Sequence, residues 1–281
     1  MSFDIYAAVT ERIIAQLEQG VIPWQKPWTG TQSGAVSGST GKPYSLLNQL
    51  LLGKPGRYYT WSQIQKLGAN VRKGEHSSMV VFWKQIPITE TNKAGEEIQR
   101  LVPMLKYYSV FHSSQCDGLP EDPVVDPAAV DPATDDLADS IIADYLNRSG
   151  VKLSHVKGDD AFYSPSRDCI QLPMREQFPH MAEYYSTAFH ELTHSTGHIS
   201  RLNRLSGNAF FGNEEYSKEE LVAEIGAAAL LSHCGIETAG SFRNSAAYIQ
   251  SWLRALRNDK RLIVSASGAA AKAFDLIVGN A

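Results

Sequence analysis

The stretch His190-Glu191-Leu192-Thr193-His194 decides how the second half of this 281-residue chain is expected to fold. The residues before it, 181–189, contain no Gly or Pro and carry apolar side chains at helical spacing, and Gly197 follows it. This pattern predicts an amphipathic helix that begins near Met181 and ends at Gly197. The two histidines would then lie one turn apart on the same face.

Two imidazoles and a carboxylate at this spacing are typical of a hydrolytic zinc site. His190 and His194 can bind one metal ion, while Glu191 lies beside a metal-bound water and acts as the catalytic general base. Zn²⁺ is the expected ion, with Mn²⁺ as the alternative, and amide hydrolysis is the expected reaction. The competing interpretation is that both histidines are polar positions of an ordinary helix.

A catalytic zinc site needs three protein ligands, so the identity of the third ligand helps to decide whether this is a zinc site and of which type. One template takes a third histidine at a position that Ser200 occupies here, and His198 comes two residues early. The other template takes a glutamate from a second helix. The sequence favours the second template.

That second helix is predicted from Ser217 to about His233. Glu220 is the expected metal ligand, Glu224 is expected to accept the N–H of a ligating imidazole, and Glu219 is the fallback ligand. The alternative for Glu220 is structural, because Ser217 and Glu220 have the spacing of a capping box.

Residues 161–173 come shortly before the motif helix and have the pattern of a short hairpin. In enzymes with this zinc motif, an edge strand just before the motif helix often borders the cleft, so this stretch is a candidate to bind a substrate backbone by strand addition, although packing alone explains the pattern equally well. Tyr163, Tyr216 and His198 are candidate donors to a developing oxyanion, and the sequence does not rank them.

Composition and charge indicate a soluble chain of two domains. The net charge is −4, no apolar run of about 18 residues occurs, and residues 3–20 have the pattern of an amphipathic helix rather than a signal peptide. We therefore expect a cytoplasmic protein without membrane contact. Its three cysteines, Cys116, Cys169 and Cys234, are widely spaced and are expected to be reduced thiols.

An acidic, Pro-rich stretch at 117–133 predicts a linker between a first domain at 1–116 and a second at 134–281. It also divides the charge, because residues 1–120 carry a net +4 and residues 121–281 a net −8. This asymmetry indicates that the first domain meets an anionic partner.

The first domain combines aromatic and basic residues in the way that proteins binding single-stranded nucleic acid do, with rings that stack on bases and cations that follow phosphates. Four of the five tryptophans lie there. The alternative is that these rings build a core. The residues predicted to contact nucleic acid are Trp24, Lys26, Trp28, Lys42, Tyr44, Trp61, Arg72, Lys73, Trp83 and Lys84.

The expected fold is α+β in two domains. In the first, we predict a helix at 4–19, a Gly/Ser-rich loop at 29–41, a short helix at 61–67, and a long hairpin from strands near 78–83 and 106–111. The second is mainly helical. Besides the two helices of the metal site, it should contain helices at 134–147, 245–257 and 267–278.

Several of these stretches together resemble the ArdC-type antirestriction proteins of plasmids. In the first half the matching stretches are 9–14, 23–28, 41–44, 60–61 and 71–75, and in the second half they are 190–197 and 219–224. The resemblance implies an N-terminal domain that binds single-stranded DNA and a C-terminal zincin-like metallopeptidase domain.

The resemblance also implies a function, which neither spacing nor charge shows. Such a protein binds incoming single-stranded DNA during conjugation and protects it from host restriction endonucleases, and the metal site would act on a host protein such as a restriction enzyme. Two alternatives stay open. One is a cytoplasmic zinc metallopeptidase whose first domain selects substrates, and the other is a non-catalytic DNA-binding protein with a structural metal.

Overall fold

The computed structural model describes residues 3–25, 34–91, 97–120, 134–205, 214–236 and 246–280. The chain forms two domains of mixed helix and sheet, as predicted. The first is built on a four-stranded sheet in the order β1-β2-β5-β4, in which β1 and β2 are parallel and the other neighbours antiparallel. Its strands are β1 (Ala35–Ser37), β2 (Gly56–Thr60), β4 (Ser78–Thr91) and β5 (Glu97–His112).

Three helices accompany this sheet: α1 (Ile5–Glu18), α2 (Leu46–Leu52) and α3 (Trp61–Lys66). Asp4 caps α1, since its carboxylate accepts a hydrogen bond from the backbone N–H of Ala7 at 3.1 Å. A second small sheet pairs β3 (Asn70–Val71) with β6 (Cys116–Asp117). The predicted helices at 4–19 and 61–67 are therefore confirmed, whereas α2, β1 and β2 are additional elements.

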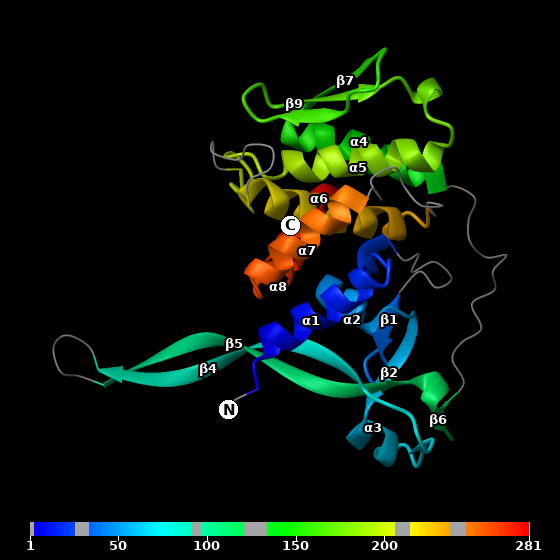
Figure 1. Cartoon of the computed structure of the whole chain (residues 1–281), viewed down its shortest axis with the longest axis vertical. Helices are drawn as coiled ribbons and strands as arrows, with labels where there is room; N and C mark the ends of the chain where they lie inside the picture. Colours follow the sequence, from blue (N-terminus) through cyan, green and yellow to red (C-terminus); the bar gives the residue numbers. More distant parts are fainter. Residues whose placement is uncertain are drawn as a thin grey trace.

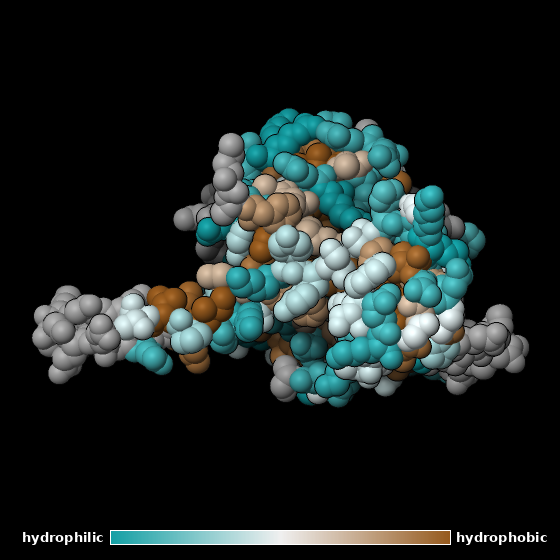
Figure 2. Space-filling model, turned by 90° about the horizontal axis from the view of Figure 1, so that it is seen from below, coloured by the Kyte–Doolittle hydropathy of each residue, from teal (hydrophilic) through white to brown (hydrophobic). Residues whose placement is uncertain are grey.

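The predicted long hairpin is confirmed and is longer than expected. Strands β4 and β5 pair continuously from Ser78 opposite Val110 to Thr91 opposite Glu97, so the strands run on through the polar stretch that separates the two apolar segments. The far part of this hairpin stands out from the rest of the molecule (Figure 1). Seen from below, it is an arm with hydrophobic residues along it (Figure 2).

In its described residues, the second half has five α-helices and a three-stranded sheet in the order β7-β9-β8. The predicted hairpin corresponds to β8 (Phe162–Ser164) and β9 (Cys169–Pro173), with β8 at an edge, while β7 (Lys152–Val156) is an additional strand parallel to β9. The helices are α4 (Thr134–Ser149), α5 (Met181–Ser195), α6 (Glu214–His233), α7 (Ala246–Asn258) and α8 (Leu262–Val278). All five were expected, but α8 begins five residues before the predicted start.

The two halves share one hydrophobic core. Buried side chains of α1 and α2 pack with those of α6, α7 and α8 in a single cluster. At its centre the rings of Trp24 and Trp252 meet edge to face, with centroids 5.1 Å apart. Figure 1 shows α1 and α2 directly below α7 and α8.

Polar contacts also join the first helix to the chain near residue 260. Thr10 Oγ1 donates a hydrogen bond to the carbonyl of Lys260 at 2.8 Å, and Lys260 Nζ lies 2.6 Å from Asp4 Oδ2. The domain boundaries stay a prediction, because residues 121–133 of the expected linker lie outside the described residues. Contact between the halves does not depend on that stretch.

No helix in the described part of the chain is long and apolar enough to cross a membrane. All three cysteines, which lie in described segments, are free thiols, as expected.

Candidate functional site

The candidate metal centre lies where α5 and α6 pack side by side. Gly226 of α6 allows this close approach, because a Cβ at that position would come within 2.6 Å of the Thr193 side chain on α5. Thr193 is fully buried, and its hydroxyl is satisfied by the carbonyl of Phe189 one turn earlier, at 2.7 Å. The backbone of α6 at Gly226 therefore packs directly against the Thr193 side chain of α5.

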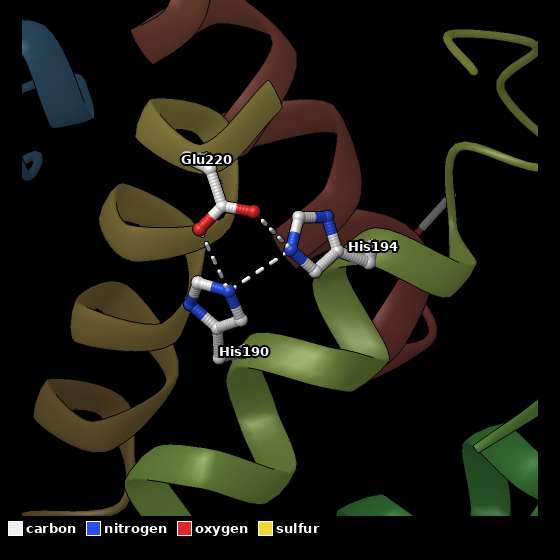
Figure 3. A group of neighbouring side chains, drawn as sticks. All are labelled: His190, His194 and Glu220. Carbon is white, nitrogen blue, oxygen red and sulfur yellow. Dashed lines mark hydrogen bonds and ion pairs between the residues drawn. The ribbon is translucent and has the colours of Figure 1, made fainter. Parts of the chain in front are cut away.

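His190 and His194 of α5 and Glu220 of α6 point toward one another across this contact (Figure 3). The Nε2 atoms of the two histidines are 2.9 Å apart, and the Glu220 carboxylate oxygens lie 3.3 Å from Nε2 of His194 and 3.7 Å from Nε2 of His190. Tetrahedral zinc with bonds of about 2.0–2.2 Å separates its ligand atoms by roughly 3.3–3.6 Å. The two separations between imidazole and carboxylate are close to this range, whereas the two Nε2 atoms, at 2.9 Å, are nearer to each other than a bound ion would hold them.

Each histidine has a further carboxylate behind it. Glu224 Oε1 lies 3.5 Å from Nδ1 of His190, and Glu219 Oε1 lies 3.3 Å from Nδ1 of His194. A carboxylate in this place fixes the tautomer and the orientation of a metal-bound imidazole, leaving Nε2 for the ion. The expectation for Glu224 agrees with this geometry. Glu219 takes the same place for the other histidine rather than that of a metal ligand.

Arg204, which the sequence analysis did not single out, holds Glu219 in place. Its guanidinium donates to both carboxylate oxygens of Glu219, at 2.8 and 3.2 Å, and to the carbonyl of Thr193 at 2.9 Å. Arg204 lies in the loop after α5, where no helical or strand periodicity marks a residue as part of the site. The one signal in the sequence is that Arg204 comes only eleven residues after Thr193, which is close enough for a contact between the loop and the end of α5.

The carboxylates change the charge state of the site. Burial alone would lower the pKa of His194, but hydrogen bonds to Glu219 and Glu220, helped by the nearby charge of Glu191, outweigh it and raise the pKa to about 10. The pKa of Glu219 is lowered from its usual range, since His194 and Arg204 overcome the effect of burial. The buried carboxylates around the two histidines therefore favour a bound cation.

Glu220 is not part of a capping box, and His198 lies outside the donor group. Helix α6 begins at Glu214, so Ser217 lies inside it and cannot be the N-cap that a capping box with Glu220 requires. His198 is not part of the three-residue donor group, and its Nδ1 instead pairs with Ser200 Oγ at 2.7 Å. Among the oxyanion candidates, Tyr163 donates to Asp168 at 2.7 Å and is held within that network.

A cavity of about 410 Å³ opens beside the donor group and contains His190 and Glu224 in its lining. Its other walls come from the loop between β7 and β8, the end of β9 and the first turns of α5. Of the three donor residues, His190 is the one that lines this cavity, whose volume lies in the range common for small-ligand sites. Glu191 is 3 % exposed in the same helix turn as His190.

The predicted nucleic-acid contacts do not form one group. Trp24 is 1 % exposed and packs in the shared core, so its predicted role in base stacking is wrong: its ring is unavailable because it fills the space between the halves. Trp61 and Trp83 are 55 % and 57 % exposed. Lys26 and Trp28 lie outside the described residues.

The remaining predicted residues are at the surface of the first half or partly buried there. Lys42, Lys73 and Lys84 are exposed. Arg72 is exposed as well, but its guanidinium already pairs with Asp117 at 3.2 Å and with the carbonyl of Ser114. Arg72 is thus less available to a phosphate than its charge suggests.

An aromatic face on the hairpin base was predicted only in part, since Tyr44 was expected to contact nucleic acid but Phe82 and Tyr108 were not. The rings of Tyr44, Phe82 and Tyr108 follow one another, with centroids 6.3 and 5.6 Å apart, and Phe82 and Tyr108 are 42 % and 50 % exposed. Lys106 stands opposite Phe82 in the strand register and therefore shares its side of the sheet. The alternation of β4 and β5 contains this information, but only once the strand register is known.

Comparison with known proteins agrees with the two halves described above. Residues 3–111 match the family described as the N-terminal domain of anti-restriction factor ArdC. Residues 140–269 match the family described as zincin-like metallopeptidase. The candidate metal ligands of α5 and α6, His190, His194 and Glu220, all lie within the second match.

Similar proteins also extend over nearly the whole chain. Two proteins named DNA primase TraC, from Escherichia coli, are 35% and 37% identical over 97% and 96% of this chain. The chain spans only 20% and 26% of their length. The protein y4eC of Sinorhizobium fredii, which is described as uncharacterized, is 32% identical, and the alignment covers 97% of this chain and 91% of that protein.

Two crystal structures of the antirestriction protein ArdC from plasmid R388 are similar as well. The metal-free structure is 39% identical and the Mn(II)-bound structure 38% identical, each with a TM-score of 0.76 and with 99% of this chain and 98% of the other covered. Sequence, fold and the paired domains all agree over this length. The chain therefore belongs to the ArdC family of antirestriction proteins.

Proposed function

We propose that this protein binds single-stranded DNA during conjugation, protects it from host restriction endonucleases, and carries a zinc-dependent peptidase site that acts on a host protein. The observation that supports the enzymatic part most directly is the donor group His190, His194 and Glu220, with a carboxylate behind each imidazole. Three ligands leave one coordination position for water or substrate, which is the arrangement of catalytic rather than structural zinc.

Zinc fits this donor set, because imidazole nitrogen and carboxylate oxygen are both among its usual ligands. Mn²⁺ is the alternative, and a related ArdC structure is described as Mn(II)-bound. Either ion would supply a Lewis acid that makes a bound water acidic. The residues of the chain do the rest: Glu191 accepts the proton, while Glu219 and Glu224 keep the imidazoles in the required orientation.

The aromatic face supports the DNA-binding part of the proposal. Tyr44, Phe82 and Tyr108 offer successive rings for stacking, and exposed Lys84 and Lys106 lie on the same hairpin for contact with phosphates. Stacking on an aromatic side chain is worth about 1–3 kcal/mol per base and does not depend on base identity. A protein that protects any incoming strand needs this tolerance of sequence.

A restriction-protection assay in cells tests the whole proposal. Restricting cells that express the native protein, Glu191→Gln, or the double variant Phe82→Ala/Tyr108→Ala receive unmodified DNA by conjugation. The recipient cells that have kept the transferred DNA are then counted. We expect the double variant to lose protection. Glu191→Gln should retain metal and strand binding but lose peptide hydrolysis.

The outcomes separate the remaining alternatives. Full protection by Glu191→Gln would show that the metal has a structural role and that coating of the strand suffices. Full protection by the double variant, with intact peptidase activity, would favour a peptidase whose first domain selects protein substrates. A metal analysis of each purified variant is the control, because it distinguishes a lost reaction from a lost ion.

A further inference from the structure

A second cavity, of about 540 Å³, lies at the junction of the two halves, and we call it the junction cavity. The first half contributes Tyr6 from α1 and Trp83 from β4, and the second half contributes the loop after α5 and one side of α8. Its volume falls in the range of ~300–1,000 Å³ that is common for small-ligand sites. The cavity is separate from the one beside the metal centre, and the two have no lining residue in common.

All the charges in its lining are positive. Arg204, Arg261 and Lys272 line the cavity, and no carboxylate does so in the described part of the chain. Arg261 lies over the ring of Tyr6, with the guanidinium carbon 5.2 Å from the ring centroid, so its planar group is already oriented. Arg204 is already paired with Glu219, whereas the described part of the chain shows no ion pair for Arg261 or Lys272. A guanidinium and an ammonium group without a counter-charge favour a phosphate.

An aromatic ring stands beside these cations. Trp83 is 57 % exposed, and in the strand register it points to the opposite side of the hairpin from Phe82. An exposed indole next to a phosphate-binding group is the combination that holds one nucleotide of a single strand. Trp83 is thus placed for the same kind of contact as the aromatic face, on the other side of the same strand.

The floor of the junction cavity is kept open by a glycine in the middle of α8. A glycine inside a helix costs roughly 0.5–1 kcal/mol relative to alanine, so it usually marks a place where a side chain would clash. At Gly268 there is no such clash, because apart from its chain neighbours and the nearby backbone of α8 no atom lies within 4 Å of the position that a Cβ would take. The missing side chain leaves space over the helix instead of allowing a close packing contact.

We propose that the junction cavity binds one nucleotide of a single strand, with the base against Trp83 and the phosphate beside Arg261 and Lys272. This inference rests on the proposed function, namely that the protein binds single-stranded DNA. It adds that the strand is held by both halves, and that it passes close to Arg204. That arginine also holds Glu219 behind the metal centre, so the cavity and the centre have one residue in common.

The test is the affinity of the full-length protein for a fluorescein-labelled oligothymidine, measured by fluorescence anisotropy. Gly268→Met fills the cavity without changing charge, and Gly268→Ala is its matched control. Lys272→Gln removes a cation, and Lys152→Gln, an exposed lysine of β7 in the same half, is the control for charge. Because Lys272 is exposed, its variant should fold even if Gly268→Met does not.

We expect Gly268→Met and Lys272→Gln each to weaken binding by about tenfold, which is the loss of one stacked base or one phosphate contact of ~1.4 kcal/mol. Both controls should bind within about twofold of the native protein. Lys272→Gln should also reduce the slope of log affinity against log salt by roughly 0.7.

Native affinity in both cavity variants would overturn the inference. If the native protein binds the oligonucleotide and Phe82→Ala/Tyr108→Ala weakens it, the proposed function stands and only the cavity assignment fails. If the native protein does not bind at all, the proposed function itself fails. Displacement of the oligonucleotide by a small excess of thymidine monophosphate would assign the cavity to free nucleotides, and would also overturn the inference.

Discussion

At the scale of single residues, the metal centre is a set of two imidazoles, each with a carboxylate on either side. His194 retains a proton up to about pH 10 in the metal-free protein, because Glu219 and Glu220 stabilise its charged form. A metal ion that binds through Nε2 must first displace a proton. The residues that attract the cation are therefore the same ones that raise the pKa of its ligand.

From this follows a pH dependence of metal affinity. Zinc affinity should rise with pH, by about tenfold per unit for one displaced proton, until the pH approaches 10. Competition with a chromophoric chelator at a series of pH values measures it. Glu219→Gln is the matched variant: it removes one source of the raised pKa, so its affinity should level off at lower pH, and a pH-independent native affinity would contradict the expectation.

The same pKa shift affects the stability of the metal-free protein. The pKa of His194 is raised above its ordinary value of 6.5, so the stabilisation is fully present below that pH and is lost as the pH rises toward 10.

The two tryptophans Trp24 and Trp83 should give opposite results on mutation. Trp24→Ala empties a space in the shared core and should cost about 3–5 kcal/mol of unfolding free energy, whereas Trp83→Ala should change it by less than ~0.5 kcal/mol. Trp83→Ala, but not Trp24→Phe, should weaken strand binding. Urea unfolding measures the change in stability of each variant. Fluorescence anisotropy with a labelled oligonucleotide measures the strand affinity of the variants that fold. A stable Trp24→Ala protein with weakened strand binding would restore its predicted role in stacking.

The sequence predicted the donor group better than it predicted the residues around it. Helical spacing alone places His190 and His194 on one face, and the choice of Glu220 needed only a second helix with a carboxylate. The contact between Glu219 and His194 depends on how the two helices are rotated against each other, and Arg204 depends on the path of a loop. Neither quantity is encoded in a local pattern.

At the scale of elements, the packing of α5 on α6 depends on Gly226. Alanine is the better helix former, yet Gly226→Ala should destabilise the protein by about 1–3 kcal/mol and weaken zinc binding, since its Cβ would press on Thr193 and push the ligands apart. Gly268→Ala is the matched control in another helix, where open space should let the same change stabilise the fold by up to ~1 kcal/mol. Thermal unfolding and zinc titration of both variants test this, and equal effects would contradict it.

The elements that the sequence missed owe their structure to their neighbours. Residues 262–266 open α8 with two β-branched side chains, Ile263 and Val264, which have no strong helical preference, but both are buried against the shared core. Likewise, the polar end of the hairpin has no alternation that stands out, and each strand there is kept extended by pairing with the other. Packing and pairing overrode local preference in both places.

At the scale of the whole molecule, the shared core joins the two domains into one thermodynamic unit. We expect a single unfolding transition in the metal-free protein, because removing either half exposes the apolar faces of α1, α6 and α8 together. Near-UV and far-UV circular dichroism in urea should give coincident curves. Two separate transitions would contradict this, and Trp24→Ala, which weakens the contact between the halves, is the variant most suited to producing them.

Composition correctly predicted two domains but not their contact. The acidic stretch at 117–133 predicted a linker between two domains and gave no information on contact between them. The apolar stripe of α1, with Val9, Ile13 and Leu17, does not reveal which partner it faces. That partner lies in the second domain. A local hydrophobic pattern shows that a face is buried, whereas its partner depends on the arrangement of the whole chain.

The bond between Thr10 and Lys260 spans 250 residues of sequence, and this separation has a consequence for how the protein is made. Contacts between residues so distant form slowly, because a long loop must close before they contribute. During synthesis, the apolar side of α1 leaves the ribosome long before α7 and α8 exist to cover it. The part of this apolar side that α7 and α8 cover therefore stays exposed until these last helices have been made.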